Sequence, residues 1–320
     1  MKAVLVRRYG PPDSIVLADL PDPVPGPRDI LVRIHAATVS SADMRMRAGR
    51  FPRGMGLLAR LAIGFTGPRK PVLGTDLAGQ VVAVGALVTA WVPGDAVVAF
   101  MGAGLGGHAQ LRVLGPGVAI CRKPASLDWA EAAAISFGGA TALYFLRDRA
   151  AVKAGERVLV VGASGAVGSA AVQLAVGWGA VVTGVCSAAK AGFVAGMGAE
   201  VIDYGRSDWA RAGRQWDVIV DTTGTVDAGR ARASLAPGGR LCLVAADLPQ
   251  MLGGVFARGM RVQTGVAPER SGDLATLAAL AEAGKFSPHV GARFALDQAA
   301  AAHALVDTGR KTGNVVLEMG

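Results

Sequence analysis

The chain has 320 residues, more than one hydrophobic core usually holds, so two domains are expected. Hydrophobic residues make up 52%, which excludes a disordered chain because there is ample apolar surface to bury. The net charge of +9 comes without a basic run interleaved with aromatic residues, so we interpret it as a basic solvated surface and do not expect a nucleic-acid partner.

Cysteine usage and hydropathy indicate the compartment. Cys121, Cys186 and Cys242 are an odd, widely spaced set, which argues against a disulfide framework and favours a reducing, cytoplasmic location. The N-terminal apolar run is interrupted by Arg7 and is too short for a signal peptide. Residues 158–189 contain no charged side chain, but six glycines divide them into pieces of strand and helix length. We therefore expect a buried βαβ unit and no membrane partner.

The N-terminal part is predicted to be β-rich. Short β-branched runs separated by Pro and Gly are typical of a compact, barrel-like domain: KAVLVRR, DILVRIHAATV, AGQVVAVG and DAVVAF. From about residue 125 the sequence becomes rich in Ala. Ser126, followed by acids from Asp128 to Glu131, predicts a helix start with a hydroxyl cap.

Six strand-like runs follow at regular intervals, with helical patterns between most of them. They are 157–162, 180–185, 199–204, 217–222, 240–245 and 261–265. Such alternation predicts a doubly wound parallel sheet with helices on both faces, the Rossmann α/β class. Near the C-terminus we expect helices at DLATLAALAEAG and LDQAAAAHALVDTG and a closing strand at NVVLEM.

A glycine-rich turn joins the first of these strands to a helix in RVLVVGASGAVGSAAVQLA. Small residues there let the backbone approach a pyrophosphate, which meets free N–H groups and the positive end of the helix. The turn supplies these candidate cofactor-binding residues: Gly162, Ser164, Gly165, Ala166, Val167 and Gly168. A tight turn without a ligand is the alternative.

The end of the second strand decides between NAD and NADP. An acidic residue there would bind the ribose hydroxyls of NAD, yet no Asp or Glu occurs between Gly168 and Glu200. Ser187 and Lys190 offer a hydroxyl and a positive charge, which suit a 2′-phosphate. We therefore predict NADPH as the cofactor, the alternative being that Lys190 is a solvated helix residue.

Taken together, these motifs resemble the medium-chain dehydrogenase/reductase superfamily, in particular its zinc-independent quinone oxidoreductase branch. The likeness covers nearly the whole chain through the segments KAVLVRRYGPPD, VSSADMRMRAG, VLGTDLAGQVVAVG, PGDAVVAF, GGHAQL, GGATAL, LAPGGRL and GNVVLEM. It implies a GroES-like catalytic domain made from both chain ends (1–123 and, after the last Rossmann strand, within 261–320), a Rossmann domain (124–260), a substrate cleft between them and a homodimer.

The resemblance also bears on cofactor and metal. It adds Tyr204 to Ser187 and Lys190 as a candidate for the 2′-phosphate. Where zinc alcohol dehydrogenases of this superfamily place a Cys and a His on their catalytic metal, this chain has Ser40 and Thr75, and neutral hydroxyls are poor zinc ligands. We predict no metal, and interpret His35, His108, His289 and His303 as surface or core residues.

Without a metal to polarise an alcohol or ketone, the substrate itself should be electrophilic, as quinones and α,β-unsaturated carbonyls are. We take Ser40, Ser41 and Thr141 as candidate catalytic residues. Ser40 and Ser41 depart from the family, which commonly has an Asn and a Pro there, but their hydroxyls could donate to a substrate oxygen. Thr141, at the start of a helix, could contact the nicotinamide. Asp43 and Asp76 match acidic positions of the family, and we assign both a structural role.

Two rival functions stay open. An enoyl-thioester reductase could use Arg45 and Arg47 for its carrier-bound substrate, and a non-catalytic NADPH-binding protein could serve a structural or RNA-binding role. The basic, apolar segment from Met44 to Phe65 is interpreted as a lid. In a sharper interpretation, Phe51, Leu57, Leu58 and Phe65 line a pocket for bulky substrates. An interfacial membrane helix is a third possibility, which the Pro and Gly content of the segment disfavours.

Overall fold

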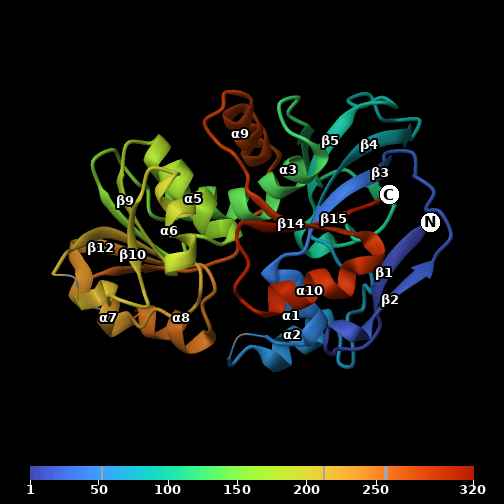
Figure 1. Ribbon diagram of the computed structural model, residues 1–320. Helices are drawn as coiled ribbons and strands as arrows, with labels where there is room; N and C mark the ends of the chain where they lie inside the picture. The colour runs from blue at the N-terminus through green and yellow to red at the C-terminus, as the bar shows by residue number, and fades with distance from the viewer. Residues whose placement is uncertain (52, 212, 256–258) are drawn as a thin grey trace. The chain divides into compact units, whose positions relative to one another are not determined.

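A computed structural model describes residues 1–51, 53–211, 213–255 and 259–320 of the protein. The chain divides into two compact units (Figure 1). The first contains Met1–Phe51, Leu57–Phe137 and Glu269–Gly320, and the second contains Pro52–Gly56 and Gly138–Pro268. The first unit is therefore built from both ends of the chain, and it includes residues 124–137, which were predicted to belong to the Rossmann domain.

The first unit contains two sheets among the described residues. The smaller is the hairpin of β1 (Lys2–Val6) and β2 (Ile15–Asp19). The larger has the order β14-β15-β3-β4-β5-β7, with β6 also pairing with β3. Its strands are β3 (Ile30–Thr38), β4 (Asp76–Val84), β5 (Ala96–Phe100), β6 (Leu111–Leu114), β7 (Ala119–Arg122), β14 (Val290–Ala295) and β15 (Asn314–Glu318).

The long strand β3 holds this unit together. It alternates buried and less buried residues, which is the pattern of a strand with one face on a core. It pairs antiparallel with β4 and, through Thr38 and Val316, with β15 from the far end of the sequence. Ile34, Leu77 and Leu317 from these strands are buried in one cluster. The predicted strands of the N-terminal part and the closing strand are thereby confirmed.

The helices of the first unit are α1 (Ser41–Ala48), α2 (Gly56–Ile63), whose first residue belongs to the second unit, α3 (Trp129–Ala134), α9 (Ser271–Glu282) and α10 (Ala299–Asp307). The last two confirm the predicted C-terminal helices. Helix α10 packs against β14 and β15, and α9 packs against β7.

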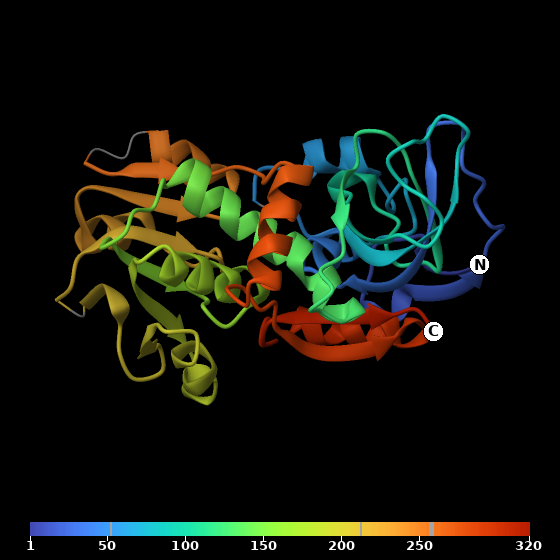
Figure 2. The same ribbon diagram turned by 90° about the horizontal axis from the view of Figure 1, so that it is seen from above.

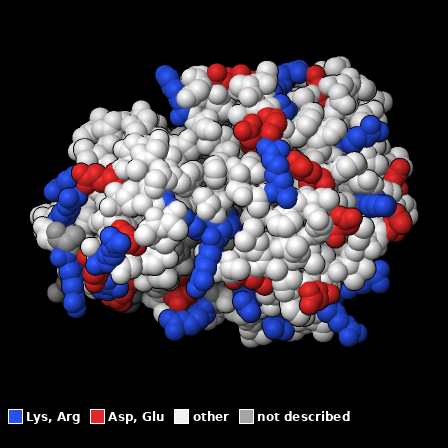
Figure 3. Space-filling view, in the orientation of Figure 1, with Lys and Arg blue, Asp and Glu red and all other residues white. Residues whose placement is uncertain are grey.

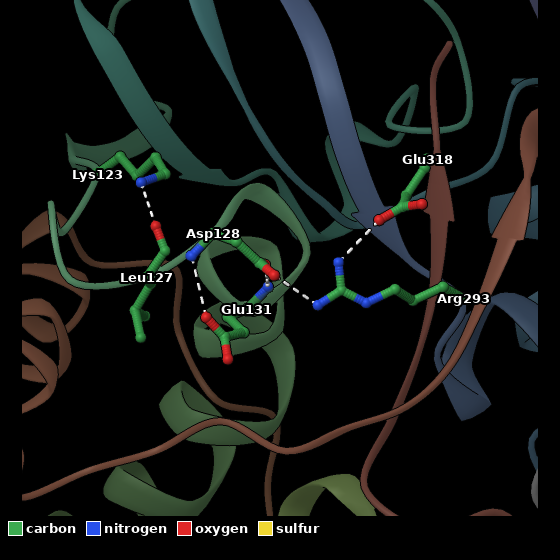
Figure 4. Close-up of polar contacts among 6 residues, drawn as sticks. All are labelled: Lys123, Leu127, Asp128, Glu131, Arg293 and Glu318. Atoms are coloured by element: carbon green, nitrogen blue, oxygen red, sulfur yellow. Dashed lines mark hydrogen bonds and ion pairs between the residues drawn. The ribbon is translucent and has the colours of Figure 1, made fainter.

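The prediction that Ser126 caps the helix was wrong, because Asp128 is the cap of α3. The Asp128 carboxylate accepts the N–H of Glu131 at 2.8 Å, and Glu131 in turn accepts the N–H of Asp128 at 2.9 Å, which forms a capping box (Figure 4). Arg293 of β14 bridges Asp128 and Glu318 at 2.5 and 2.9 Å. Asp128 therefore both caps α3 and pairs with Arg293 of β14.

The second unit is a parallel sheet with the order β10-β9-β8-β11-β12-β13. Its strands are β8 (Arg157–Val161), β9 (Val181–Cys186), β10 (Glu200–Asp203), β11 (Trp216–Asp221), β12 (Leu235–Leu243) and β13 (Arg261–Gln263). All six predicted runs thus contribute strands to one sheet. The order reverses direction between β8 and β11, which is the arrangement of a Rossmann fold.

Helices cover both faces of this sheet (Figures 1 and 2). They are α4 (Ala140–Leu143), α5 (Ala166–Gly177), α6 (Ala191–Ala195), α7 (Ala228–Ser234) and α8 (Leu248–Val255). Helices α5 and α6 contact β8, β9 and β10, whereas α7 and α8 contact β12 and β13. Strand residues such as Leu159, Ile219 and Leu241 are fully buried, as expected for a sheet covered on both sides. The predicted α/β fold class is confirmed.

No helix of the described residues combines the length and the apolar character that crossing a bilayer requires.

Candidate functional site

The glycine turn between β8 and α5 is shaped for a close backbone approach. Gly162 has a positive φ of 81°, which favours glycine, and a Cβ there would crowd Thr222 and Thr223. A Cβ on Gly168 would overlap the carbonyl oxygen of Gly162, so the helix begins in direct contact with the turn. A Cβ on Gly165 would meet only the Gly162 carbonyl oxygen, at 3.5 Å. The turn is thus closed on the protein side and open beyond Gly165.

The N-terminus of α5 keeps its amide groups available. Gly165 is the N-cap residue and supplies no side-chain cap, so the first N–H groups of the helix, from Ala166, Val167 and Gly168, lack a side-chain acceptor. Ser164 is buried beside them. With this donor set and the helix dipole, the turn fits a pyrophosphate.

The three residues predicted to contact a 2′-phosphate come together at the carboxyl ends of two neighbouring strands. Ser187 follows β9 directly, and its carbonyl oxygen accepts the N–H of Lys190 at 2.9 Å in the 3-10 turn Ala188–Lys190. Tyr204 follows β10, and its N–H donates to the carbonyl oxygen of Cys186 at 3.1 Å. The Tyr204 side chain is 65% exposed.

Partial burial lowers the pKa of the Lys190 ammonium from its ordinary value. A bound anion would offset this, because an opposite charge stabilises the protonated form. Burial is also the main cause of the raised pKa of the neighbouring Cys186 thiol.

Sequence reasoning missed an acid at this edge. Asp203 ends β10 and pairs in register with Cys186, which places it beside the predicted phosphate residues. Its carboxylate accepts the N–H of Gly205 at 3.0 Å and lies 3.7 Å from the Arg206 guanidinium. The backbone and Arg206 both offset its negative charge. Only the register of β9 with β10 reveals this acid, since it lies outside the segment between Gly168 and Glu200.

A second missed residue, Asp221, organises the loop after β11. Its buried carboxylate accepts N–H groups of Thr223, Gly224 and Val226 at 2.8–3.1 Å. The hydroxyl of Thr222 donates to the carbonyl oxygen of Val161 at 2.9 Å, immediately before Gly162. The loop is thus fixed against the glycine turn at the point where the strand order reverses, which is where such sheets bind their ligands.

Thr141 lies on α4, which packs against α5. The contact is close, since a Cβ on Gly138 would come within 2.8 Å of the Ala166 carbonyl oxygen at the start of α5. Thr141 is buried, and its hydroxyl forms no hydrogen bond with the described residues. The second unit thus brings Thr141 toward the same end of α5 as the glycine turn.

The two candidate serines of the first unit differ in their contacts. Ser40 is buried and caps α1: its hydroxyl donates to Asp43 at 2.6 Å and accepts the Asp43 N–H at 3.2 Å. Ser41 is the first residue of α1, is half-buried, and has no side-chain hydrogen bond within the described part of the chain. The Ser40 hydroxyl therefore already donates its hydrogen to Asp43. The Ser41 hydroxyl can still donate a hydrogen bond to a ligand.

Asp43 and Asp76, for which we predicted a structural role, both accept hydrogen bonds from their own unit. Asp43 also accepts the N–H of Gly74 at 3.0 Å, and Asp76 accepts the N–H and the hydroxyl of Thr38 at 2.7 and 2.6 Å. Both carboxyls are fully buried. Burial raises the pKa of Asp76 to about 7, against the opposing effect of the hydrogen bonds from Thr38.

Arg47 is not available to a substrate. Its side chain is 1% exposed, and both carboxylate oxygens of Asp307 accept from it at 2.6 Å. His108 and His303 are buried nearby with ring centroids 5.8 Å apart. Burial, followed by the charges of His108 and Arg47, lowers the pKa of His303 to about 2, so His303 is neutral. Arg45, by contrast, is only half-buried.

His35, His289 and the apolar residues of the basic segment have ordinary packing contacts or are exposed. His35 stacks on Trp129 at 4.3 Å, and the His289 carbonyl oxygen accepts from Asn314. Phe51 is half-buried and contacts Tyr9 edge-on, whereas Leu57, Leu58 and Phe65 are exposed. Within the second unit, Arg53 pairs with Asp247 at 2.9 Å, and its carbonyl oxygen accepts the Leu248 N–H.

Comparison with known proteins agrees with this fold. The model of the alcohol dehydrogenase GroES-like domain matches residues 26–154, and the model of the zinc-binding dehydrogenase matches residues 197–317. A quinone oxidoreductase of Pseudomonas aeruginosa is 31% identical over 340 residues, covering 99% of both chains. One of Sus scrofa is 30% identical over 338 residues, covering 99% of this chain and 97% of the relative. The solved quinone oxidoreductase of Coxiella burnetii matches with a TM-score of 0.89 at 26% identity, covering 100% of this chain and 99% of that one.

The two units and these relatives define an oxidoreductase with a GroES-like domain and a Rossmann domain, of the class that binds a nicotinamide cofactor. The chain belongs to the medium-chain dehydrogenase/reductase superfamily, in its quinone oxidoreductase branch.

One matched model is named for zinc, and the residues present do not fit that metal. Among the residues that the structure describes, no three His, Cys, Asp or Glu side chains are grouped to hold an ion. At the two positions that the resemblance aligns with zinc ligands, the Ser40 hydroxyl is bound to Asp43, and the Thr75 hydroxyl is buried without a hydrogen-bond partner in the described chain. Neutral hydroxyls are poor zinc ligands, so these two positions do not suit a catalytic zinc.

Proposed function

We propose that the protein is an NADPH-dependent, zinc-independent reductase that transfers a hydride to a quinone or an α,β-unsaturated carbonyl. The observation that carries the proposal is the grouping of Ser187, Lys190 and Tyr204 beside an open glycine turn. A hydroxyl, an ammonium group and a phenol at this place suit a ribose 2′-phosphate better than a bare diol.

The residues of the second unit bind and orient the cofactor in this proposal. The N–H groups of Ala166, Val167 and Gly168 hold the pyrophosphate, and Lys190 pairs with the 2′-phosphate. Thr141, on the helix packed against α5, contacts the nicotinamide. The cofactor supplies the hydride, and the protein fixes its geometry.

In the first unit, we assign the hydrogen-bond donor for the substrate oxygen to Ser41 rather than Ser40. Quinones and enones need little polarisation, because the oxyanion formed on hydride addition is stabilised by conjugation. One hydrogen-bond donor is then sufficient to stabilise the negative charge that develops on that oxygen. The free hydroxyl of Ser41 can provide it, since Ser40 already donates to Asp43.

The test is NADPH oxidation by the purified protein, with an ortho-quinone and a trans-enone measured side by side against a reaction without acceptor. Turnover with either one is the expected result, and their ratio identifies the substrate class. No turnover with either, despite NADPH binding, would contradict the proposal. Activity confined to enoyl thioesters would favour the rival reductase, although burial of Arg47 already removes one of its two suggested contacts.

A further inference from the structure

Helix α2 turns its largest apolar side chains away from the protein. Leu57, Leu58, Leu61 and Phe65, which follows the helix, are 67%, 65%, 49% and 53% exposed, whereas Ala59 and Ile63 are half-buried. No described residue of α2 is fully buried. Single exposed leucines are ordinary on a protein surface, but four large apolar side chains within nine positions indicate an interaction site.

Cations without acidic partners border these apolar side chains. Arg60 donates to the Phe65 carbonyl oxygen at 2.9 Å and lies over the Tyr9 ring, and Arg69 donates to the Ala62 carbonyl oxygen at 3.2 Å. Lys70 is held by the carbonyl oxygens of Ala103 and Gly104. All three are exposed, and none pairs with a carboxylate of the described chain.

The charge of this segment is unbalanced in the sequence. Figure 3 shows Lys and Arg side chains beside Asp and Glu side chains over much of the face that it draws. Between Asp43 and Asp76 the sequence has seven basic residues and no acid. Glu269 packs on Gly102, next in sequence to the Ala103 and Gly104 carbonyl oxygens that accept from Lys70.

We propose that Leu57, Leu58, Leu61 and Phe65, with the rim of Arg60, Arg69 and Lys70, form a docking surface for an anionic phospholipid bilayer. We call this set the α2 surface. An occupant must be apolar opposite the leucines and negative opposite the cations over the same area. A bilayer with acidic headgroups meets both demands, because acyl chains lie directly beneath the charged layer.

The structure removes the objection that the sequence raised. Pro and Gly in this segment argue against an interfacial helix only if they interrupt it. Gly56 is the first residue of α2, and Gly64 and Pro68 follow its end, so the leucines lie on an unbroken helix. Beyond that end the chain is anchored, because the Tyr9 hydroxyl donates to the Gly64 carbonyl oxygen at 2.6 Å. The apolar face is therefore held in place while it points outward.

The experiment is cosedimentation of the full-length protein with vesicles of phosphatidylglycerol and phosphatidylcholine, and with vesicles of phosphatidylcholine alone, at low and high salt. We expect binding to the anionic vesicles that weakens with salt. Arg60→Gln with Arg69→Gln should reduce it by about 30-fold, and Leu58→Ser with Leu61→Ser by about 10-fold or more. Exposed residues elsewhere provide the controls, Arg232→Gln and Leu87→Ser, which should leave binding unchanged.

A second readout reports insertion directly. After subtraction of the wild-type spectrum, which comes from five native tryptophans, the emission of Leu58→Trp should shift to shorter wavelength on anionic vesicles, whereas that of Leu87→Trp should not. Absence of binding to anionic vesicles at low salt, or equal binding to phosphatidylcholine, would overturn the proposal. A changed oligomeric state of the leucine variants would also overturn it, by identifying the α2 surface as a contact between copies of this chain. Vesicle binding is measured without turnover, so these results are independent of the proposed reductase activity.

Discussion

The glycine turn of the second unit and the polar cluster around α1 in the first unit use their polar groups in opposite ways. At the turn, the amides at the start of α5 have no side-chain cap, and Gly165 borders open space. In the cluster, Ser40, Asp43, Thr38 and Asp76 satisfy one another and the backbone. The turn is therefore organised to receive a ligand, whereas the cluster mainly stabilises the first unit. The Ser41 hydroxyl, at the start of α1, has no hydrogen bond within the described chain.

The largest expected effect on the glycine turn comes from Gly168→Ala. The new Cβ would overlap the carbonyl oxygen of Gly162, so either the helix or the turn must move. We expect a loss of about 4 kcal/mol or more in the free energy of unfolding, together with loss of cofactor binding. Chemical denaturation and titration with NADPH would measure both effects.

Gly177→Ala, in the same helix, is the matched control. A Cβ at Gly177 has no neighbour within 4 Å, so this change should stabilise the protein by about 0.5–1 kcal/mol and leave NADPH affinity unchanged. Similar behaviour of the two variants would show that the turn does not need its close backbone contact.

The second prediction concerns the pH dependence of the polar cluster. The pKa of Asp76 is raised to about 7 in the folded protein, so this carboxyl keeps its proton up to near neutral pH, while the unfolded chain releases it near pH 4. The protonated Asp76 carboxyl therefore contributes most to the free energy of unfolding below about pH 4, and this contribution is lost as the pH rises to about 7.

The free energy of unfolding of Asp76→Asn should lack this decline, which is on the order of 3 kcal/mol. The stability of the variant relative to the wild type should therefore increase as the pH rises. Denaturant titrations at several pH values would measure it, with the exposed Asp13→Asn as control. A parallel pH profile for Asp76→Asn and the wild type would show that burial does not control this carboxyl.

The smallest expected effects separate the two serines. Ser40→Ala removes the cap of α1 and should cost about 1 kcal/mol in stability. Ser41→Ala should leave stability within about 0.5 kcal/mol of the wild type, yet lower kcat for the quinone or enone about 10-fold or more. An unchanged kcat for Ser41→Ala would remove it as the donor to the substrate oxygen.

Local patterns made much of the second unit predictable. Alternation of apolar runs with helices gave the six strands, and the spacing of Gly162, Gly165 and Gly168 located the turn, because both depend on residues close in sequence. Tyr204 was added to Ser187 and Lys190 by the family resemblance, and the parallel pairing of β9 with β10 places the ends of these two strands at one edge.

Contacts between distant residues account for what could not be predicted. The ion pair of Arg47 with Asp307 joins residues 260 positions apart, so the burial of Arg47 is invisible in the sequence. Asp128 replaces Ser126 as a cap where Arg293 arrives from another strand. Asp203 lies beside Ser187 and Tyr204 only because β10 pairs with β9 in this register.

The central claim is that the group of Ser187, Lys190 and Tyr204 selects a cofactor that carries a 2′-phosphate. The most direct test is the affinity of the wild type and of Lys190→Ala for NADPH and NADH, measured by calorimetry. We expect the wild type to prefer NADPH, and Lys190→Ala to weaken NADPH about 10-fold or more while changing NADH little, because a charge-assisted contact is lost only with the phosphate. Equal weakening of both cofactors, or a wild type that prefers NADH, would contradict the account.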